Sequence, residues 1–187
     1  MRLFVALAIP CAVRDNLATL INDLRITAPK ARWVRPENIH VTLKFIGEVV
    51  PDKLESIRGA LSNVRSERSV ELNFRGLGYF PNPKRPSVLW AGIDASPNLP
   101  SLAADIDRSL EKLGFPREQR AFVPHLTIAR FQPPRIHEKL QSAIAQSSGR
   151  DFGSLRTGEF HLVESKLKPS GPQYTTIETI RFSAAGA

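Results

Sequence analysis

The stretch Ile39-His-Val-Thr-Leu-Lys-Phe-Ile-Gly47 decides the fold, because the chain carries a second version of it at Pro124-His-Leu-Thr-Ile-Ala-Arg-Phe-Gln132. Each version places a His and a Thr two positions apart in an apolar run. Such runs predict buried strands, in which residues two apart point to the same face. Each strand therefore offers one imidazole beside one hydroxyl. The copies lie 85 residues apart, which indicates two similar halves.

The sequence around these stretches predicts an α+β fold. We expect helices where apolar residues recur at helical spacing: after Pro10, after Pro51, from Pro97 to Gly114, and over Ile136–Ile144. Strands are expected over residues 3–9, 39–47, 70–75, 87–93, 121–131, 159–168 and 173–182, with a connector at 31–38, a loop at 76–86 and turns at 149–153 and 169–172. This order indicates two mostly antiparallel sheets with helices on their outer sides.

The size and charge of the chain limit its class. A chain of 187 residues fits one domain, here residues 1–187, composed of two lobes. Its 26 Lys and Arg residues outnumber its 18 Asp and Glu residues, for a formal net charge of +8. A basic surface attracts polyanions such as nucleic acid. The alternative is that the charge reflects only an arginine-rich composition.

The compartment follows from the single cysteine and from the apolar runs. Cys11 has no second cysteine to pair with, which favours a reducing compartment. Arg2 and residues 3–9 resemble a short signal peptide, but the run is at the minimum length and suits a buried strand better. No apolar stretch approaches the roughly 18 residues of a membrane span. We expect a cytoplasmic protein.

Two imidazoles and two hydroxyls facing one another would have a definite chemistry. The unperturbed pKa of histidine is about 6.5, so near neutral pH one of His40 and His125 can act as base and the other as acid. Thr42 and Thr127 can donate hydrogen bonds to an anion between them. This set suits phosphoryl ester chemistry without a metal or a cofactor.

Other interpretations of the pairs are weaker. Two His are too few for a typical catalytic zinc site, and Thr is a poor ligand. Nothing in the sequence indicates the strained turn that a nucleophilic Thr uses. Each His could instead be an ordinary core residue beside a Thr, but the duplication argues against this. His137 and His161 lack a partner Thr and are expected to be ordinary residues.

Beyond its chemistry, the chain resembles a known family. His40-Val-Thr-Leu and His125-Leu-Thr-Ile are similar to the paired His-x-Thr-x motifs of the 2H phosphoesterase superfamily. The surrounding sequence resembles the RNA 2′,3′-cyclic phosphodiesterases, also called 2′-5′ RNA ligases. The segments that carry this resemblance are Arg2-Leu-Phe-Val-Ala, His40-Val-Thr-Leu-Lys-Phe-Ile-Gly-Glu48, Gly76-Leu-Gly-Tyr-Phe-Pro81, Val88-Leu-Trp90, Pro124-His-Leu-Thr-Ile-Ala-Arg130 and the tail Ser165…Gly171-Pro-x-Tyr174.

The resemblance implies a bilobal fold with a pseudo-two-fold axis, a central cleft and one motif in each lobe. It implies hydrolysis of a terminal 2′,3′-cyclic phosphate on RNA to a 2′-phosphomonoester without a metal, with ligation as the reverse reaction. His40 would donate a proton to the leaving 3′-oxygen, and His125 would accept one from water. Thr42 and Thr127 would hold the non-bridging phosphate oxygens. The residues alone leave open which His is the acid.

Three further residues are candidates for substrate binding. Lys44 shares the parity of His40 and so can reach the cleft, or it is a solvated lysine at a strand end. The resemblance suggests that Arg130 contacts phosphate or a nucleobase, although its parity is opposite to that of His125 unless the strand bends near Ala129. Phe4 can stack on a base, with core packing as the favoured alternative.

The sequence also indicates a binding partner and leaves two alternative functions open. The expected partner is an RNA or oligonucleotide end with a 2′,3′-cyclic phosphate, with no metal, no membrane and a monomeric protein. One alternative is a 2H phosphodiesterase acting on small cyclic nucleotides or on a cyclic phosphate of ADP-ribose. The other is a module that binds RNA ends without catalysis.

Overall fold

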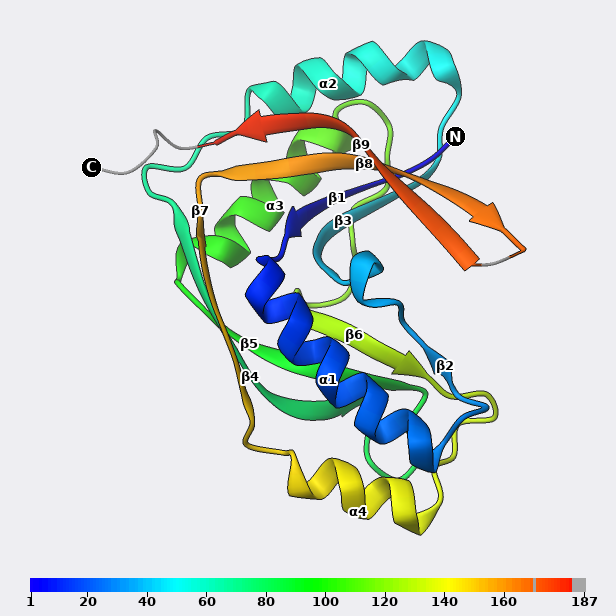
Figure 1. Ribbon diagram of the computed structural model, residues 1–187. Coiled ribbons are helices and arrows are strands. Elements are labelled where there is room, and N and C mark those ends of the chain that lie inside the picture. The colour runs from blue at the N-terminus through cyan, green and yellow to red at the C-terminus, as the bar shows by residue number, and fades with distance from the viewer. Residues whose placement is uncertain (170, 183–187) are drawn as a thin grey trace.

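The computed structural model describes residues 1–169 and 171–182 and contains two antiparallel sheets, one above the other in Figure 1. The four-stranded sheet has the order β3 (His40–Glu48), β1 (Arg2–Ala8), β8 (Glu159–Lys168) and β9 (Gly171–Arg181). The five-stranded sheet has the order β2 (Arg32–Trp33), β6 (His125–Arg130), β5 (Val88–Ala95), β4 (Val70–Phe80) and β7 (Asp151–Thr157). The first His-x-Thr pair lies in the four-stranded sheet and the second in the five-stranded sheet.

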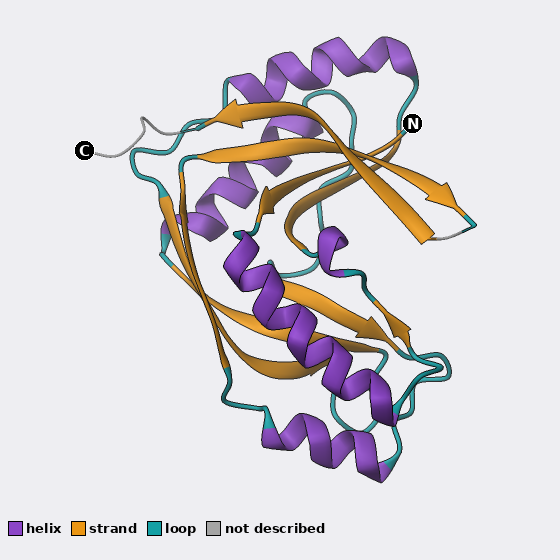
Figure 2. Ribbon diagram, viewed as in Figure 1, coloured by secondary structure: helices purple, strands orange, loops and turns teal. Residues whose placement is uncertain are grey.

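Four α-helices lie around the two sheets in the described residues (Figure 2). α2 (Leu54–Ser62) contacts α3 and β9, and α3 (Asn98–Glu111) contacts β3. α1 (Cys11–Thr27) contacts β7 of the other sheet and also α4 (Glu138–Gln146). Each helix buries the apolar stripe that its periodicity predicted, such as Val13, Leu17, Leu20, Ile21 and Leu24 of α1. The α+β class and the antiparallel sheets are therefore confirmed. None of the helices in the described segments is long and apolar enough to span a membrane.

β1 is one of the two inner strands of the four-stranded sheet. Its residues Leu3 to Leu7 are all buried, because β3 and β8 flank it and apolar side chains cover both of its faces. Most of them join the main core, whereas Phe4 and Ala6 pack with Val163 and Tyr174 in a small separate cluster. The continuous apolar run at residues 3–9 is thus a buried strand, as predicted.

Several predicted boundaries were wrong. Residues 151–157 form β7, where we expected a turn over 149–153; only Phe152 is fully buried, so this edge strand has little apolar alternation. Residues 121–124 are not a strand, because the pairing of β5 with β6 begins at Gly92 and His125. The short strand β2 lies within the expected connector. The predicted turn over residues 169–172 includes position 170, which lies outside the described residues.

The loop expected over residues 76–86 is also partly strand, because β4 continues to Phe80. Gly76, with φ of 75°, lies where the pairing of β4 with β5 shifts register. Gly78 pairs with Trp90, whose ring lies 2.2 Å from where a Cβ of residue 78 would stand, so only glycine fits there. The glycines that indicated a loop instead let the strand bend and admit an aromatic ring.

The two sheets, each of which forms one lobe of the fold, do not correspond to two consecutive halves of the chain. β1 and β3 from the first half pair with β8 and β9 from the end of the chain. β4 and β5, also from the first half, pair with β6 and β7. Each lobe is therefore assembled from both halves of the chain.

Candidate active site

Both His-x-Thr pairs line one cavity of about 320 Å³ between the lobes. His40 and Thr42 come from β3, and His125 and Thr127 come from β6. All four side chains are partly exposed, whereas the residues between them, Val41 and Leu126, are buried in the core. The alternation of the strands thus turns an imidazole and a hydroxyl from each lobe toward the same space. The other lining residues are Arg32, Trp33, Val34, Arg35, Asn38, Ile39, Phe45, Arg130, Gly171, Pro172 and Tyr174.

The two imidazoles are oriented by equivalent hydrogen bonds. Nδ1 of His40 lies 2.8 Å from the carbonyl oxygen of Asn38, and Nδ1 of His125 lies 2.8 Å from that of Val123. A carbonyl oxygen only accepts hydrogen bonds, so Nδ1 carries the proton and donates in both rings. Among the described residues, Nε2 of each ring has no hydrogen-bond partner and is therefore available to a substrate. An unprotonated Nε2 can accept a proton as a base, and a protonated Nε2 can donate one as an acid.

The surroundings of His40 determine its charge state. Burial lowers the pKa of His40, the hydrogen bond to Asn38 opposes this shift, and positive charge on His125 lowers the pKa further. His40 is therefore mainly uncharged at neutral pH when the cavity holds no anion. An anion bound between the rings would raise the pKa of the nearer imidazole and restore its proton.

Aromatic rings support both imidazoles. The Phe4 ring stacks on His40 at 4.7 Å between centroids, and Tyr174 meets His40 edge-on at 5.2 Å. In the other lobe, Phe80 meets His125 edge-on at 5.0 Å. Phe4 is only 3% exposed, so its ring packs beneath the imidazole and is not open to a nucleobase. The core-packing alternative for Phe4 thus holds.

A β-bulge follows the Thr in each motif strand. In β3, Thr42 pairs with Ala6 and Lys44 with Val5, which leaves Leu43 unpaired. In β6, Thr127 pairs with Trp90 and Ala129 with Leu89, which leaves Ile128 unpaired. A bulge inserts one residue and so reverses the facing of the side chains that directly follow it in the strand. The burial order along the two strands is the same as a result.

The bulges decide where two candidate residues lie. Arg130 emerges on the cavity side, as the predicted bend near Ala129 required, and lines the cavity. Lys44 turns the other way and is only 7% exposed, so both expectations for it, a cleft contact and a solvated lysine, were wrong. Phe45, which is 62% exposed, occupies in β3 the position that Arg130 has in β6.

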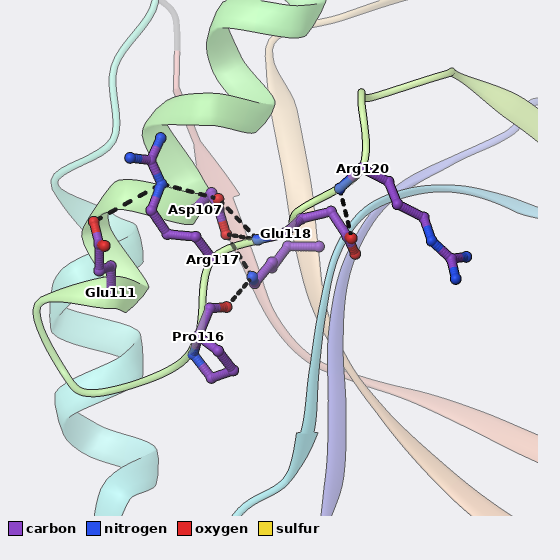
Figure 3. Close-up of polar contacts among 7 residues, drawn as sticks. Asp107, Glu111, Pro116, Arg117, Glu118 and Arg120 are labelled. Atoms are coloured by element: carbon purple, nitrogen blue, oxygen red, sulfur yellow. Dashed lines mark hydrogen bonds and ion pairs between the residues drawn. The ribbon is translucent and has the colours of Figure 1, made fainter.

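Lys44 instead joins a polar cluster whose members Asp107, Pro116, Arg117 and Glu118 are labelled in Figure 3. Its Nζ forms an ion pair with Asp107 of α3 and donates to the carbonyl oxygen of Pro116 at 2.6 Å. The Asp107 carboxylate also accepts from the backbone N–H of Glu118, at 3.3 Å to its nearer oxygen, and pairs with Arg117. The cluster ties the strand that carries His40 to the segment that leads to His125.

Several residues that line the cavity were not predicted from the sequence. Phe45 was missed because only the bulge turns it outward. Tyr174 was visible in the resemblance of the tail but was not assigned to the site. Arg32, Trp33 and Arg35 lie in the expected connector. No carboxylate lines the cavity, and in residues 1–169 and 171–182 no group of three or more His, Cys, Asp or Glu could hold a metal ion.

Comparisons with known proteins show what this chain is similar to. The family model described as LigT-like phosphoesterase matches residues 7–90 and 93–174, so each matched segment contains one His-x-Thr pair. A protein of Methanothermobacter thermautotrophicus named RNA 2′,3′-cyclic phosphodiesterase is 35% identical over 97% of this chain and 99% of its own. An Archaeoglobus fulgidus protein of the same name is 37% identical over 93% of this chain and 96% of its own.

Solved structures share the fold. A crystal structure from Thermus thermophilus covers 97% of this chain and 98% of its own at 30% identity, with a TM-score of 0.77. The apo form of Escherichia coli LigT covers 98% of both chains at 23% identity, with a TM-score of 0.78. At that lower identity the likeness concerns the fold alone.

Proposed function

Because this chain belongs to the LigT-like phosphoesterase family, we propose that it hydrolyses terminal 2′,3′-cyclic phosphodiesters of RNA to 2′-phosphomonoesters. The names of the two archaeal relatives support this substrate. The observation that carries the proposal is the cavity lined by two imidazoles, each with Nδ1 bonded to a carbonyl and Nε2 free, and by two Thr hydroxyls. Cyclic phosphate hydrolysis needs an acid, a base and donors to the phosphate oxygens, and this cavity offers all three.

The proposed reaction is one displacement at phosphorus. Nε2 of His125 takes a proton from water while the water oxygen bonds to phosphorus. The bond from phosphorus to the 3′-oxygen breaks, and Nε2 of His40 gives its proton to that oxygen. The Thr42 and Thr127 hydroxyls donate hydrogen bonds to the non-bridging oxygens, whose charge grows in the transition state. The 5′-hydroxyl of a second RNA strand could attack in place of water, which gives 2′-5′ ligation.

The family resemblance implies that His40 is the acid. His40 can have this role only if the bound substrate favours its protonated form. In the free protein, burial lowers the pKa of His40, which alone would favour it as the base. The phosphodiester anion offsets this, because a negative charge beside an imidazole favours its protonated form. Proton uptake by His40 on substrate binding is therefore part of the proposal.

We also propose that the reaction needs no metal ion. The described lining of the cavity presents two nitrogen ligands and no carboxylate, whereas catalytic zinc sites use three protein ligands and magnesium prefers carboxylates. The charge of the phosphate is met by the hydroxyls, by the protonated imidazole and by Arg130. These groups take the place that a cation has in other phosphoryl transfer sites.

The test is incubation of the protein with an RNA oligonucleotide ending in a 2′,3′-cyclic phosphate, in the presence of EDTA. Phosphorus NMR should show the cyclic phosphate signal replaced by that of a 2′-monoester, at the same rate with and without the chelator. The matched control is the His40→Ala/His125→Ala double variant, which should leave the substrate intact. An unreacted substrate with the unaltered protein, or activity abolished by EDTA, would contradict the proposal.

A further inference from the structure

A second cavity, of about 440 Å³, adjoins the active-site cavity. Arg32 and Arg130 line both cavities. They are direct cross-strand partners in the pairing of β2 with β6, so their side chains point to the same face. Two guanidinium groups therefore stand together at the boundary between the cavities.

The two cavities share a surface of unpaired positive charge. This surface, which we call the basic track, consists of five exposed cations: Lys30, Arg32, Arg35, Arg130 and Arg135. Among the described residues, no Asp or Glu lines either cavity, and no carboxylate lies within 4.0 Å of any of these five cations. Like charges gathered without partners repel one another, and a bound polyanion relieves that repulsion.

The wall of the second cavity is apolar and held in place. Its apolar lining comes from Ala28, Pro29, Ala31, Phe131, Pro133, Ile136 and Leu140. His137 fixes one side, because its Nε2 donates to the carbonyl oxygen of Thr27 at 2.8 Å while its Nδ1 accepts from the N–H of Leu140. The Trp33 indole donates to the carbonyl oxygen of Ala28 at 2.8 Å. The end of α1, β2 and the start of α4 therefore converge at the lower right of Figure 1.

We propose that this second cavity binds the nucleotide on the 5′ side of the cyclic-phosphate end, which makes an RNA strand, and not a mononucleotide, the preferred substrate. The inference rests on the function proposed above. A 2′,3′-cyclic phosphate ends its strand, so the rest of the RNA must leave the active-site cavity in the 5′ direction. The basic track offers that exit cations for the internal phosphates, and the apolar wall offers a surface for a base.

The test compares two substrates in one variant. The Lys30→Ala/Arg135→Ala variant removes two cations that line only the second cavity. We expect its kcat/KM for a short RNA with a cyclic-phosphate end to fall at least about tenfold further than that for a 2′,3′-cyclic mononucleotide, since each charged contact contributes a factor of this order. The slope of log kcat/KM against log salt for the RNA should become shallower by about 1.4, from two single-strand phosphate contacts.

The matched control is Arg68→Ala/Lys112→Ala, which removes two exposed cations that do not line the second cavity or the active-site cavity. It should leave the preference for RNA over the mononucleotide unchanged. Equal losses on both substrates in the Lys30/Arg135 variant, or no preference for RNA in the unaltered protein, would overturn the subsite while leaving the phosphodiesterase activity standing. Failure of the unaltered protein to open either substrate would overturn the proposed function, and the subsite with it.

Discussion

Replacement of His40 or His125 by alanine should each lower kcat by about 10²–10⁴, the usual loss when one general acid or base is removed. Each imidazole is the one group on its motif strand that both lines the cavity and can change its protonation near neutral pH, because Lys44 is turned into the core and Arg130 stays charged. Neither loss can therefore be replaced from the same strand. The measurement is single-turnover cleavage of a cyclic-phosphate RNA, which separates chemistry from product release.

His161→Ala is the matched control for this prediction. His161 is also partly buried, and its Nδ1 is hydrogen-bonded to the Thr179 hydroxyl at 2.9 Å, but it does not line the active-site cavity. The kcat of the His161→Ala variant should stay close to that of the unaltered protein. Near-normal turnover in the His40 or His125 variant would rule out the acid/base pair.

Asp107→Ala should lower the free energy of unfolding by about 3–5 kcal/mol, the typical cost of leaving one member of a buried ion pair without its partner. The Lys44 side chain is only 6% exposed and the Asp107 side chain 12%, so the ammonium left behind would have little water to solvate it. The backbone N–H of Glu118 would also lose an acceptor. Urea unfolding followed by circular dichroism measures the change.

The chain offers a close control in Asp105→Ala on the same helix. Asp105 pairs with Arg108, whose side chain is 61% exposed, so the loss should stay below about 1 kcal/mol. The Lys44→Met/Asp107→Leu double variant should recover much of the stability, because an apolar pair of similar volume replaces the buried charges. If Asp107→Ala cost no more than Asp105→Ala, the buried Lys44–Asp107 pair would not stabilise the fold as predicted.

The parts of the fold that the sequence predicted are those with strong hydrophobic periodicity. β8 was predicted with its observed bounds, Glu159–Lys168, and all four helices were found through their apolar stripes. β2 and β7 were missed, because they are sheet-edge strands that bury few side chains and leave little pattern. The pairing of strands from the two ends of the chain could not be predicted either, because hydrophobic periodicity does not indicate which strands pair with each other.

In the candidate site, the sequence predicted the facing of some side chains and not of others. The parity rule predicted the facing of His40, Thr42, His125 and Thr127, because these residues precede the bulges. The rule fails after Leu43 and Ile128, where one extra residue reverses the facing. This is why the facing of Lys44 was predicted wrongly, why Phe45 was overlooked, and why Arg130 reaches the cavity against its parity.

The pH dependence of kcat/KM tests most directly the claim that two strands contribute one acid and one base. We expect a bell-shaped profile for the unaltered protein. His40→Ala, which lacks the acid, should lose the decline at high pH and keep the rise. His125→Ala, which lacks the base, should lose the rise at low pH and keep the decline. A profile in the unaltered protein that is flat from acid to alkaline pH would contradict the paired imidazoles, and exchanged limbs in the two variants would contradict the assignment of His40 as the acid.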